Sequence, residues 1–259
     1  MVDQLRFQRR LPDLQHPTTF SEKIAHRMLY DRDPRIPPMV DKIAAKEQMA
    51  SRFGPDFIIP TLATFSTEAE VDFGALPYPC VIKPNHASGF NVFLKERPAN
   101  ESEVRRKLGS LLRYRHELSA EEWAYSQIPA RLLVEPFIEG GRLGLVDYKF
   151  HTFAGRVFSI QVDVARFTDH RRCFFDQAWT PMPFELLYPR ADYEISPPFS
   201  LEEMIRSAEQ IGKGFSYVRV DLYEIEGKVK FGEATFYPGA GLEVFKPREF
   251  DALFGEQWV

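Results

Sequence analysis

The segment that decides the fold reads YVRVDLY at residues 217–223 and VKFGEATFYPG at residues 229–239. Both runs are rich in β-branched and aromatic residues and flank the turn dipeptide Glu226-Gly227, so they predict the two strands of a hairpin. Side chains alternate between the faces of a strand, so Arg219, Asp221 and Tyr223 share one face. Such charges on otherwise apolar strands indicate either a functional site or an edge hairpin whose charges point to solvent.

The carboxylates Asp221 and Glu233 suggest a metal site next to Arg219. Mg²⁺ takes oxygen ligands and often binds through one or two carboxylates plus phosphate. The two residues are twelve positions apart, so we expect them on one face only if the hairpin loop has an odd number of residues, such as Glu226–Lys228. A two-residue turn would put them on opposite faces.

Composition fits a globular protein with one large domain or two lobes: 259 residues, 44% hydrophobic and 27% charged. The formal charge of −4 does not support a nucleic-acid partner. Cys80 and Cys173 stand in apolar runs and predict buried thiols rather than a disulfide. The sequence shows neither a membrane-spanning apolar run nor a secretory signal at its start, so we expect a cytoplasmic protein.

Local patterns predict an α+β protein in which helices precede a β-rich second half. Capping chemistry at 19–23 opens the first helix, which runs to about 30. Further helices are expected at 39–53, 101–117, 119–127, 200–213 and 247–254. Further strands are expected at 57–65, 80–83, 91–95, 131–136, 145–153, 156–165 and 171–176, with an irregular loop at 178–198. We expect an N-terminal arm and helix at 1–38, a first lobe at 39–136 and a second lobe at 137–259.

Three upstream segments add candidate nucleotide contacts. The run DKIAAK at 41–46 places two lysines four residues apart on one helix face, which could equally be a solvated face. The run VIKPNHASGF at 81–90 ends a strand with a lysine and a small-residue loop, an arrangement suited to phosphate but short of a Walker sequence. The run LLVEPFIEGG at 132–141 leads an apolar strand through a carboxylate to a flexible turn.

Together these segments resemble the ATP-grasp superfamily, specifically the TupA-like proteins of bacterial cell-surface polymer synthesis. The resemblance runs from Thr19 to Phe254. Its most specific pieces are TFSEKI at 19–24, DYKF at 147–150, RFTDH at 166–170, RVDLY at 219–223 and GEATFYPG at 232–239. It implies an ATP-grasp fold, in which two α+β lobes clamp the nucleotide between them.

The resemblance also implies roles for individual residues. The residues implied to bind phosphate are Lys83 and either Lys42 or Lys46, of which Lys42 is favoured, together with His86, Ser88 and Gly89 of the loop. Those for adenine and ribose are Glu135, Phe137, Ile138 and Glu139, and Lys149 is a softer candidate for phosphate or substrate. Those for Mg²⁺ or Mn²⁺ are Asp221, Glu233 and Thr235. Arg219 and Lys83 are the expected catalytic cations, since a guanidinium suits a transferring phosphoryl group.

Two departures from the family pattern and one basic cluster complete the candidates. Thr235 stands where the superfamily usually has Asn, and Ala87 and Phe90 stand where related loops are richer in Gly. The cluster could bind an acidic acceptor or be a charged turn; its members are Arg166, His170, Arg171 and Arg172.

The resemblance implies an ATP-dependent carboxylate–amine ligase that acts through an acyl-phosphate in cell-surface polysaccharide or peptide-polymer synthesis. Its acceptor would be a small molecule, glycan or peptide bearing a carboxylate, and a partner protein from the same system could complete the site. The alternatives are a kinase acting on a glycan or another hydroxyl, and a non-catalytic nucleotide- or glycan-binding module. The sequence contains no convincing nucleophile–base constellation of a hydrolase.

Overall fold

The computed structural model describes residue 8 and residues 11–87, 89–115, 122–140, 144–166 and 168–259. The chain forms two compact units, Arg32–Glu139 and a second unit that joins Met1–Asp31 to Gly140–Val259. These units meet at 31/32 and 139/140, whereas we expected boundaries at 38 and 136. The N-terminal helix, however, packs with the C-terminal half of the chain, because its apolar side chains lie against that half's aromatic core.

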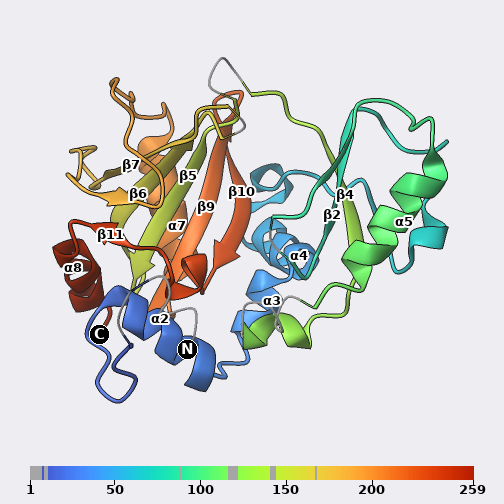
Figure 1. Cartoon of the computed structure of the whole chain (residues 1–259). Coiled ribbons are helices and arrows are strands. Elements are labelled where there is room, and N and C mark those ends of the chain that lie inside the picture. Colours follow the sequence, from blue (N-terminus) through green and yellow to red (C-terminus); the bar gives the residue numbers. More distant parts are fainter. Residues whose placement is uncertain (1–7, 9–10, 88, 116–121, 141–143, 167) are drawn as a thin grey trace. The chain divides into compact units, whose positions relative to one another are not determined.

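The unit Arg32–Glu139 is built on a four-stranded antiparallel sheet with the order β1-β4-β2-β3 (Figure 1). The strands are β1 (Ala63–Phe65), β2 (Cys80–Pro84), β3 (Val92–Leu94) and β4 (Leu132–Pro136). The helices are α3 (Ile36–Val40), α4 (Lys42–Phe53) and α5 (Glu101–Leu112), with 3₁₀ turns η1 (Pro55–Phe57), η2 (Glu68–Glu70) and η3 (Trp123–Gln127). Buried side chains from the sheet, α5 and the segment between η2 and β2 form its core, among them Ile82, Leu108 and Phe73.

Two predicted elements of this unit differ in the structure. The helix expected at 39–53 is interrupted at Asp41, whose carboxylate accepts a hydrogen bond from the Ile43 amide at 2.9 Å and so caps α4. Pro37 lies in the first turn of α3, where a missing N–H costs nothing. The strand expected at 57–65 is confined to β1, because Pro55–Phe57 turns as a 3₁₀ helix.

The other unit is built on a five-stranded antiparallel sheet with the order β10-β9-β5-β6-β7 (Figure 1). Its strands are β5 (Asp147–Phe153), β6 (Arg156–Val164), β7 (Arg171–Phe175), β9 (Tyr217–Ile225) and β10 (Lys228–Thr235). The short strands β8 (Glu185–Leu186) and β11 (Phe245–Lys246) form a ribbon beside it, and η4 (Pro238–Gly241) follows β10. The helices are α2 (Phe20–Tyr30), α7 (Leu201–Gly212) and α8 (Glu249–Gln257).

Helices cover both faces of this sheet. Helix α7 packs across β5, β6 and β9, and its apolar side includes the buried Met204 and Ile211. Helices α2 and α8 pack on the opposite face, where Phe20 and Phe254 make edge contacts with His151. Thr19 and Glu22 form the predicted capping box at the start of α2. The aromatic cluster leaves the rest of that face to polar side chains.

The hairpin of β9 and β10 corrects our expectation about its loop. Ile225 pairs with Lys228, so the turn has two residues, Glu226 and Gly227, both with positive φ. Even so, Glu233 pairs directly with Asp221, because a β-bulge between Phe231 and Glu233 adds one residue to β10. The expectation of a loop with an odd number of residues was therefore wrong. The extra residue Gly232, and not the turn, puts Asp221 and Glu233 on the same face of the sheet.

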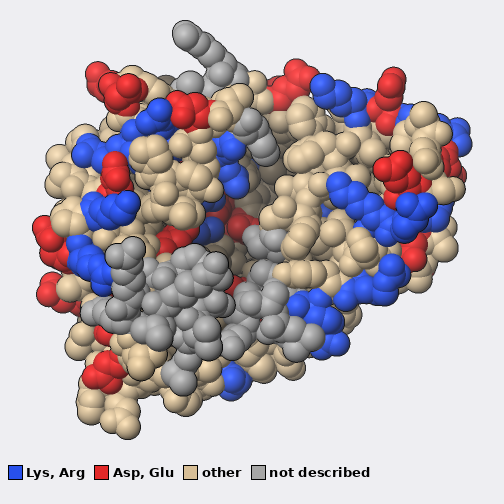
Figure 2. Space-filling model, in the orientation of Figure 1, with Lys and Arg blue, Asp and Glu red and all other residues tan. Residues whose placement is uncertain are grey.

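Among the described residues, no helix is both long enough and apolar enough to cross a membrane. Figure 2 shows acidic and basic side chains interspersed over the visible face. Cys80 and Cys173 are both buried free thiols, as predicted.

Candidate functional site

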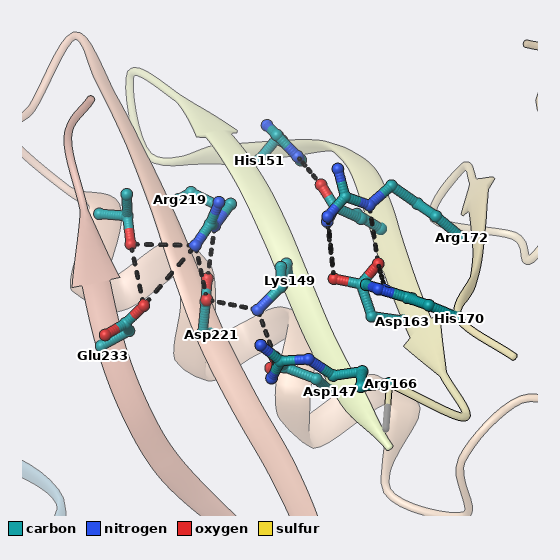
Figure 3. A network of polar contacts seen from close by, with 12 residues as sticks. Asp147, Lys149, His151, Asp163, Arg166, His170, Arg172, Arg219, Asp221 and Glu233 are labelled. Atoms are coloured by element: carbon teal, nitrogen blue, oxygen red, sulfur yellow. Dashed lines mark hydrogen bonds and ion pairs between the residues drawn. The ribbon is translucent and has the colours of Figure 1, made fainter. Parts of the chain in front are cut away.

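Four adjacent strands of the five-stranded sheet bring a polar network onto one face (Figure 3). Glu233 of β10 pairs with Asp221 of β9, and Asp221 pairs with Lys149 of β5. Lys149 in turn pairs with Gln161 of β6. Directly paired residues of antiparallel strands point to the same face, so sheet register alone aligns the hairpin carboxylates with a lysine.

Asp221 is the centre of the network. Its carboxylate accepts two hydrogen bonds from Arg219, from Nε at 2.7 Å and from Nη2 at 2.8 Å, and a third from Lys149 Nζ at 2.8 Å. Burial raises the pKa of Asp221, and the two cations oppose that rise. Burial also works to lower the pKa of Arg219, but Asp221 outweighs it and raises the value well above its usual range. This bidentate, charge-assisted pair fixes both side chains.

Lys149 joins Asp221 to a second buried carboxylate, Asp147. Its ammonium donates to Oδ2 of each of them. Burial works to lower the pKa of Lys149, but Asp147 and Asp221 together raise it. Asp147 Oδ2 also accepts from Arg166 Nη1 at 2.7 Å, whereas its Oδ1 is buried without a partner among the described residues.

Glu233 and Thr235 complete the candidate metal ligands. Glu233 Oε1 lies 3.7 Å from Arg219 Nη2. The Thr235 hydroxyl accepts from Arg219 Nη2 at 3.1 Å and donates to Glu233 at 3.5 Å. No group of three acidic, His or Cys residues suited to a metal occurs in the described ranges. The donor set is therefore two carboxylates and a hydroxyl, which fits a hard cation that also takes phosphate oxygens.

A second branch of the network runs across the same face from His151. The Tyr217 hydroxyl lies 3.0 Å from His151 Nδ1, and His151 Nε2 lies 3.3 Å from Gln161 Oε1. Gln161 donates to Asp163 at 2.9 Å, so its oxygen faces His151 Nε2, and the histidine carries its proton there. Burial, followed by the charge of Arg219, lowers the pKa of His151 to about 3, so the ring is neutral.

The basic cluster expected to bind an acidic acceptor is divided in the structure. Arg172 is buried and donates to Asp163 Oδ1 from Nε at 2.7 Å, and His170 Nε2 lies 3.1 Å from the same oxygen. Arg171 pairs with the exposed Asp169. Arg166 extends from the buried Asp147 and is itself exposed. Arg172 and His170 therefore share Asp163, whereas Arg166 and Arg171 each pair with a different carboxylate.

The other unit holds its own buried ion cluster, in which Glu135 joins two lysines. Lys46 contacts Glu135 Oε1, and Lys83 donates to Oε2 at 2.6 Å. Burial works to raise the pKa of Glu135, but the two lysines outweigh it and lower the value. Burial lowers the pKa of Lys46, and Glu135 opposes part of that effect. Of the two lysine candidates on α4, it is Lys46 that reaches Glu135.

The remaining candidates of this unit lie around the same sheet. Lys42 is half-buried at the start of α4 and donates its amide to the Asn85 carbonyl at 3.2 Å. His86 is buried, with Nε2 3.1 Å from the Tyr114 carbonyl. Gly89 is exposed with φ of 82°, and Ser88 lies outside the described residues. The expected hinge residues follow β4: Phe137 and Ile138 are half-buried, and Glu139 is exposed.

Comparison with known proteins identifies the family of this chain. The model of the TupA-like ATPgrasp family matches residues 22–259. The chain belongs to the TupA-like ATP-grasp family. The match covers nearly the whole chain and confirms the predicted family and its ATP-grasp fold. A search of curated proteins finds no match.

Several solved ligase structures are similar to this TupA-like protein at low identity. D-Alanine–D-alanine ligase from Helicobacter pylori is 16% identical, with a TM-score of 0.48 over 93% of this chain and 69% of that one. The Bacillus anthracis ligase complexed with ATP is 16% identical, with a TM-score of 0.44 over 76% and 53%. The ATP-grasp ligase PsnB with its minimal precursor is 13% identical, with a TM-score of 0.44 over 78% and 53%. The chain thus spans about half the length of several ligases that it matches.

The TupA-like protein also contains site residues that sequence reasoning missed. Asn85 is fully buried; it donates to Asp41 Oδ1 at 3.0 Å and accepts from the Arg131 amide at 2.7 Å. It therefore ties the start of α4 to the strands that carry Lys83 and Glu135. His151 had a signal, because a histidine at alternate spacing from Asp147 and Lys149 shares their strand face.

Proposed function

We propose that the protein is an ATP-dependent carboxylate–amine ligase that acts through an acyl-phosphate. The carrying observation is the network in which Asp221, paired across the hairpin with Glu233, is flanked by Arg219 and Lys149. Such a set of oxygen ligands and fixed cations, in a member of the ATP-grasp family, suits phosphoryl transfer, where positioning and charge stabilisation dominate.

Each ion cluster has a part in this proposal. Lys46 and Lys83 bind nucleotide phosphate, and the contact of Lys46 with Glu135 favours it over Lys42. Arg219 and Lys149 bind the anionic oxygens of the γ-phosphoryl group, because both are held as cations by Asp221. The hinge through Phe137 and Ile138 binds adenine, with Glu139 directed to ribose.

Asp221, Glu233 and Thr235 would hold Mg²⁺ or Mn²⁺, which supplies neutralisation of phosphate charge when bound. Arg219 Nη2 contacts or lies near all three of these side chains, so it fixes their rotamers before any ligand arrives. The bulge at Gly232 gives Glu233 its place opposite Asp221.

The reaction has two steps. An oxygen of the acid substrate attacks the γ-phosphorus and breaks its bond to the β–γ bridging oxygen, which gives ADP and an acyl-phosphate. An amine nitrogen then attacks the carbonyl carbon and expels phosphate, while the amine loses a proton to solvent. We place the acceptor in a cell-surface polysaccharide or peptide polymer made from cytoplasmic precursors, on the strength of the TupA-like family match.

The test uses the double variant Asp221→Asn with Glu233→Gln. We expect it to lose MgATP binding in calorimetry, since it keeps the side-chain shapes and removes the charge. Its urea midpoint should also fall, because Arg219 and Lys149 lose the charge of their buried partner, so calorimetry is run at a temperature where circular dichroism shows the variant to be folded. Asp169→Asn is the control, because the exposed Asp169 pairs with Arg171 and not with the residues of this centre. Unchanged MgATP binding by the double variant would remove the metal assignment. With a substrate, ³¹P NMR separates free phosphate, the ligase product, from phosphate retained on a hydroxyl, the kinase product.

A further inference from the structure

The arginines around the polar network share one way of meeting a carboxylate. Arg219 presents its Nε and Nη2 edge to Asp221, at 2.7 and 2.8 Å. Arg172 presents the same edge to Asp163, at 2.7 and 3.4 Å. Arg171 also uses this edge, but its Nε and Nη2 both donate to one oxygen, Asp169 Oδ2, at 3.0 and 2.8 Å. This edge has two parallel N–H donors, which match the two oxygens of a carboxylate.

Arg166 differs from the other three. Its only side-chain contact with the described residues is from Nη1 to Asp147 Oδ2, at 2.7 Å. Its Nε and Nη2 edge therefore has no partner in the described part of the chain. The side chain is 42% exposed, whereas Asp147 beneath it is 2% exposed. Arg166 is thus anchored at one nitrogen, and its two-donor edge is available to a ligand.

The anchor connects Arg166 to the candidate phosphate site. Asp147 Oδ2 accepts from both Arg166 and Lys149, and Lys149 also donates to Asp221. Three consecutive contacts thus lead from the exposed guanidinium to the carboxylate proposed to bind the metal. A group bound at Arg166 would lie on the same polar face as the γ-phosphoryl contacts (Figure 3).

We propose that the Nε and Nη2 edge of Arg166 binds a carboxylate of the acid substrate, with Asp147 as the residue that positions the guanidinium. This assignment rests on the proposed ligase function and narrows it. Of the four cations in the basic cluster, Arg171 and Arg172 already use their two-donor edges, and His170 is directed to Asp163. Arg166 is accordingly the specificity-determining residue, and the substrate class is a carboxylate-bearing molecule.

The probe for this site is the dicarboxylate glutarate. Its neutral diamide, glutaramide, is the uncharged control compound. In ¹⁵N spectra of the arginine Nε–H groups, the Arg166 signal, assigned by its loss in Arg166→Lys, should shift saturably with glutarate at constant ionic strength. It should not respond to glutaramide, and the Arg171 signal should stay in place. An Arg166 signal that does not saturate, or that follows both probes alike, would overturn the assignment.

Variants provide the second readout. Arg166→Gln should weaken glutarate binding about tenfold or more, because a charge-assisted contact is lost. Arg166→Lys keeps the charge and can keep the pair with Asp147, so it should fold normally and bind with intermediate affinity. Arg171→Gln, which removes an exposed arginine of the same segment, should bind as the wild type does. Equal weakening by Arg171→Gln and Arg166→Gln would reject a specific site.

The outcome is separable from that of the ligase proposal. MgATP binding, measured by calorimetry on the same variants, should be unchanged in Arg166→Gln, since Arg166 is not among the proposed nucleotide contacts. If the wild-type protein binds MgATP but shows no saturable glutarate binding, only the Arg166 assignment is removed. Saturable glutarate binding in a protein that does not bind MgATP would remove the ligase and leave a carboxylate site.

Discussion

Gly232 is the residue on which the alignment of the candidate metal carboxylates depends, and Gly232→Ala tests this directly. A Cβ at this position would lie 2.8 Å from Cε2 of Tyr223 and 3.0 Å from the backbone oxygen of Asp221. Ordinary contacts between carbon atoms are about 3.5–4.0 Å. The ring can turn by a small amount, but the backbone oxygen can move only if β9 moves, and β9 carries Asp221.

The expected cost is that of overpacking a well-packed site, about 1–3 kcal/mol. With an m-value of about 3 kcal/mol per M, the urea midpoint should fall by about 0.3–1 M. The hairpin could escape the clash by giving up the bulge, but Glu233 would then move to the opposite face of the sheet. Either way we expect weaker MgATP binding together with lower stability.

Two further variants make the test specific. Gly74→Ala is a matched control, because the nearest atoms to its added Cβ are the ends of the Asp72 and Arg97 side chains, at 3.2 and 3.6 Å. Deleting Gly232 removes the extra residue and leaves a regular hairpin in which Glu233 still pairs with Asp221. The deletion should therefore bind MgATP better than Gly232→Ala does. Either of two results would refute this reasoning. Gly232→Ala could be as stable as the wild type and bind MgATP equally well, or the deletion variant could bind MgATP more weakly than Gly232→Ala. In either case the bulge would not be what aligns Asp221 with Glu233.

Three other predictions follow from buried polar groups. Because the pKa of His151 is about 3 in the folded protein, against a usual 6.5, its contribution to stability is complete above pH 6.5 and is lost as the pH falls toward 3. The loss is about 1.4 kcal/mol per pH unit, and urea titrations at stepped pH should show a flatter profile in His151→Gln. Lys46→Met should weaken MgATP binding at least tenfold more than Lys42→Met in calorimetry, because Lys46 is the α4 lysine that lies with Lys83 on Glu135; equal effects would contradict this. Asn85→Ala should cost about 3 kcal/mol in urea unfolding, since it removes three part-buried hydrogen bonds made by a fully buried side chain, and a cost below 1 kcal/mol would count against its role.

The sequence was sufficient for the fold and for most elements, but not for the register of the hairpin that carries Asp221 and Glu233. Alternation places Arg219, Asp221 and Tyr223 on one face whatever lies around them, and that inference needs no partner strand. The relation of Asp221 to Glu233 depends on pairing across the hairpin, where a single extra residue reverses the parity. Gly232 was the available signal, because a glycine inside a strand often marks a bulge.

The choice between Lys42 and Lys46 was beyond the sequence for a different reason. Both lie on one helix face, and helical spacing cannot say which of them reaches a neighbouring strand. Asp41 caps α4 and so sets where the helix begins. Lys46 then lies one turn farther along the helix than Lys42, and it is Lys46 that contacts Glu135 and the Thr61 hydroxyl. Tertiary packing, rather than spacing, decides which of the two lysines reaches Glu135.

The buried charges on the polar face of the five-stranded sheet are stabilised because carboxylates and cations lie next to each other. The carboxylates Asp147, Asp163, Asp221 and Glu233 are each in contact with at least one of the cations Lys149, Arg166, Arg172 and Arg219, and Arg172 also contacts Glu243. Removing one member leaves an uncompensated charge, which costs more than the pair itself contributes. An incoming anion can take over Lys149 or Arg219 only if a cation takes over Asp221 at the same time. The balance therefore favours a ligand that brings both charges together, as a nucleotide with its divalent ion does, over either ion alone.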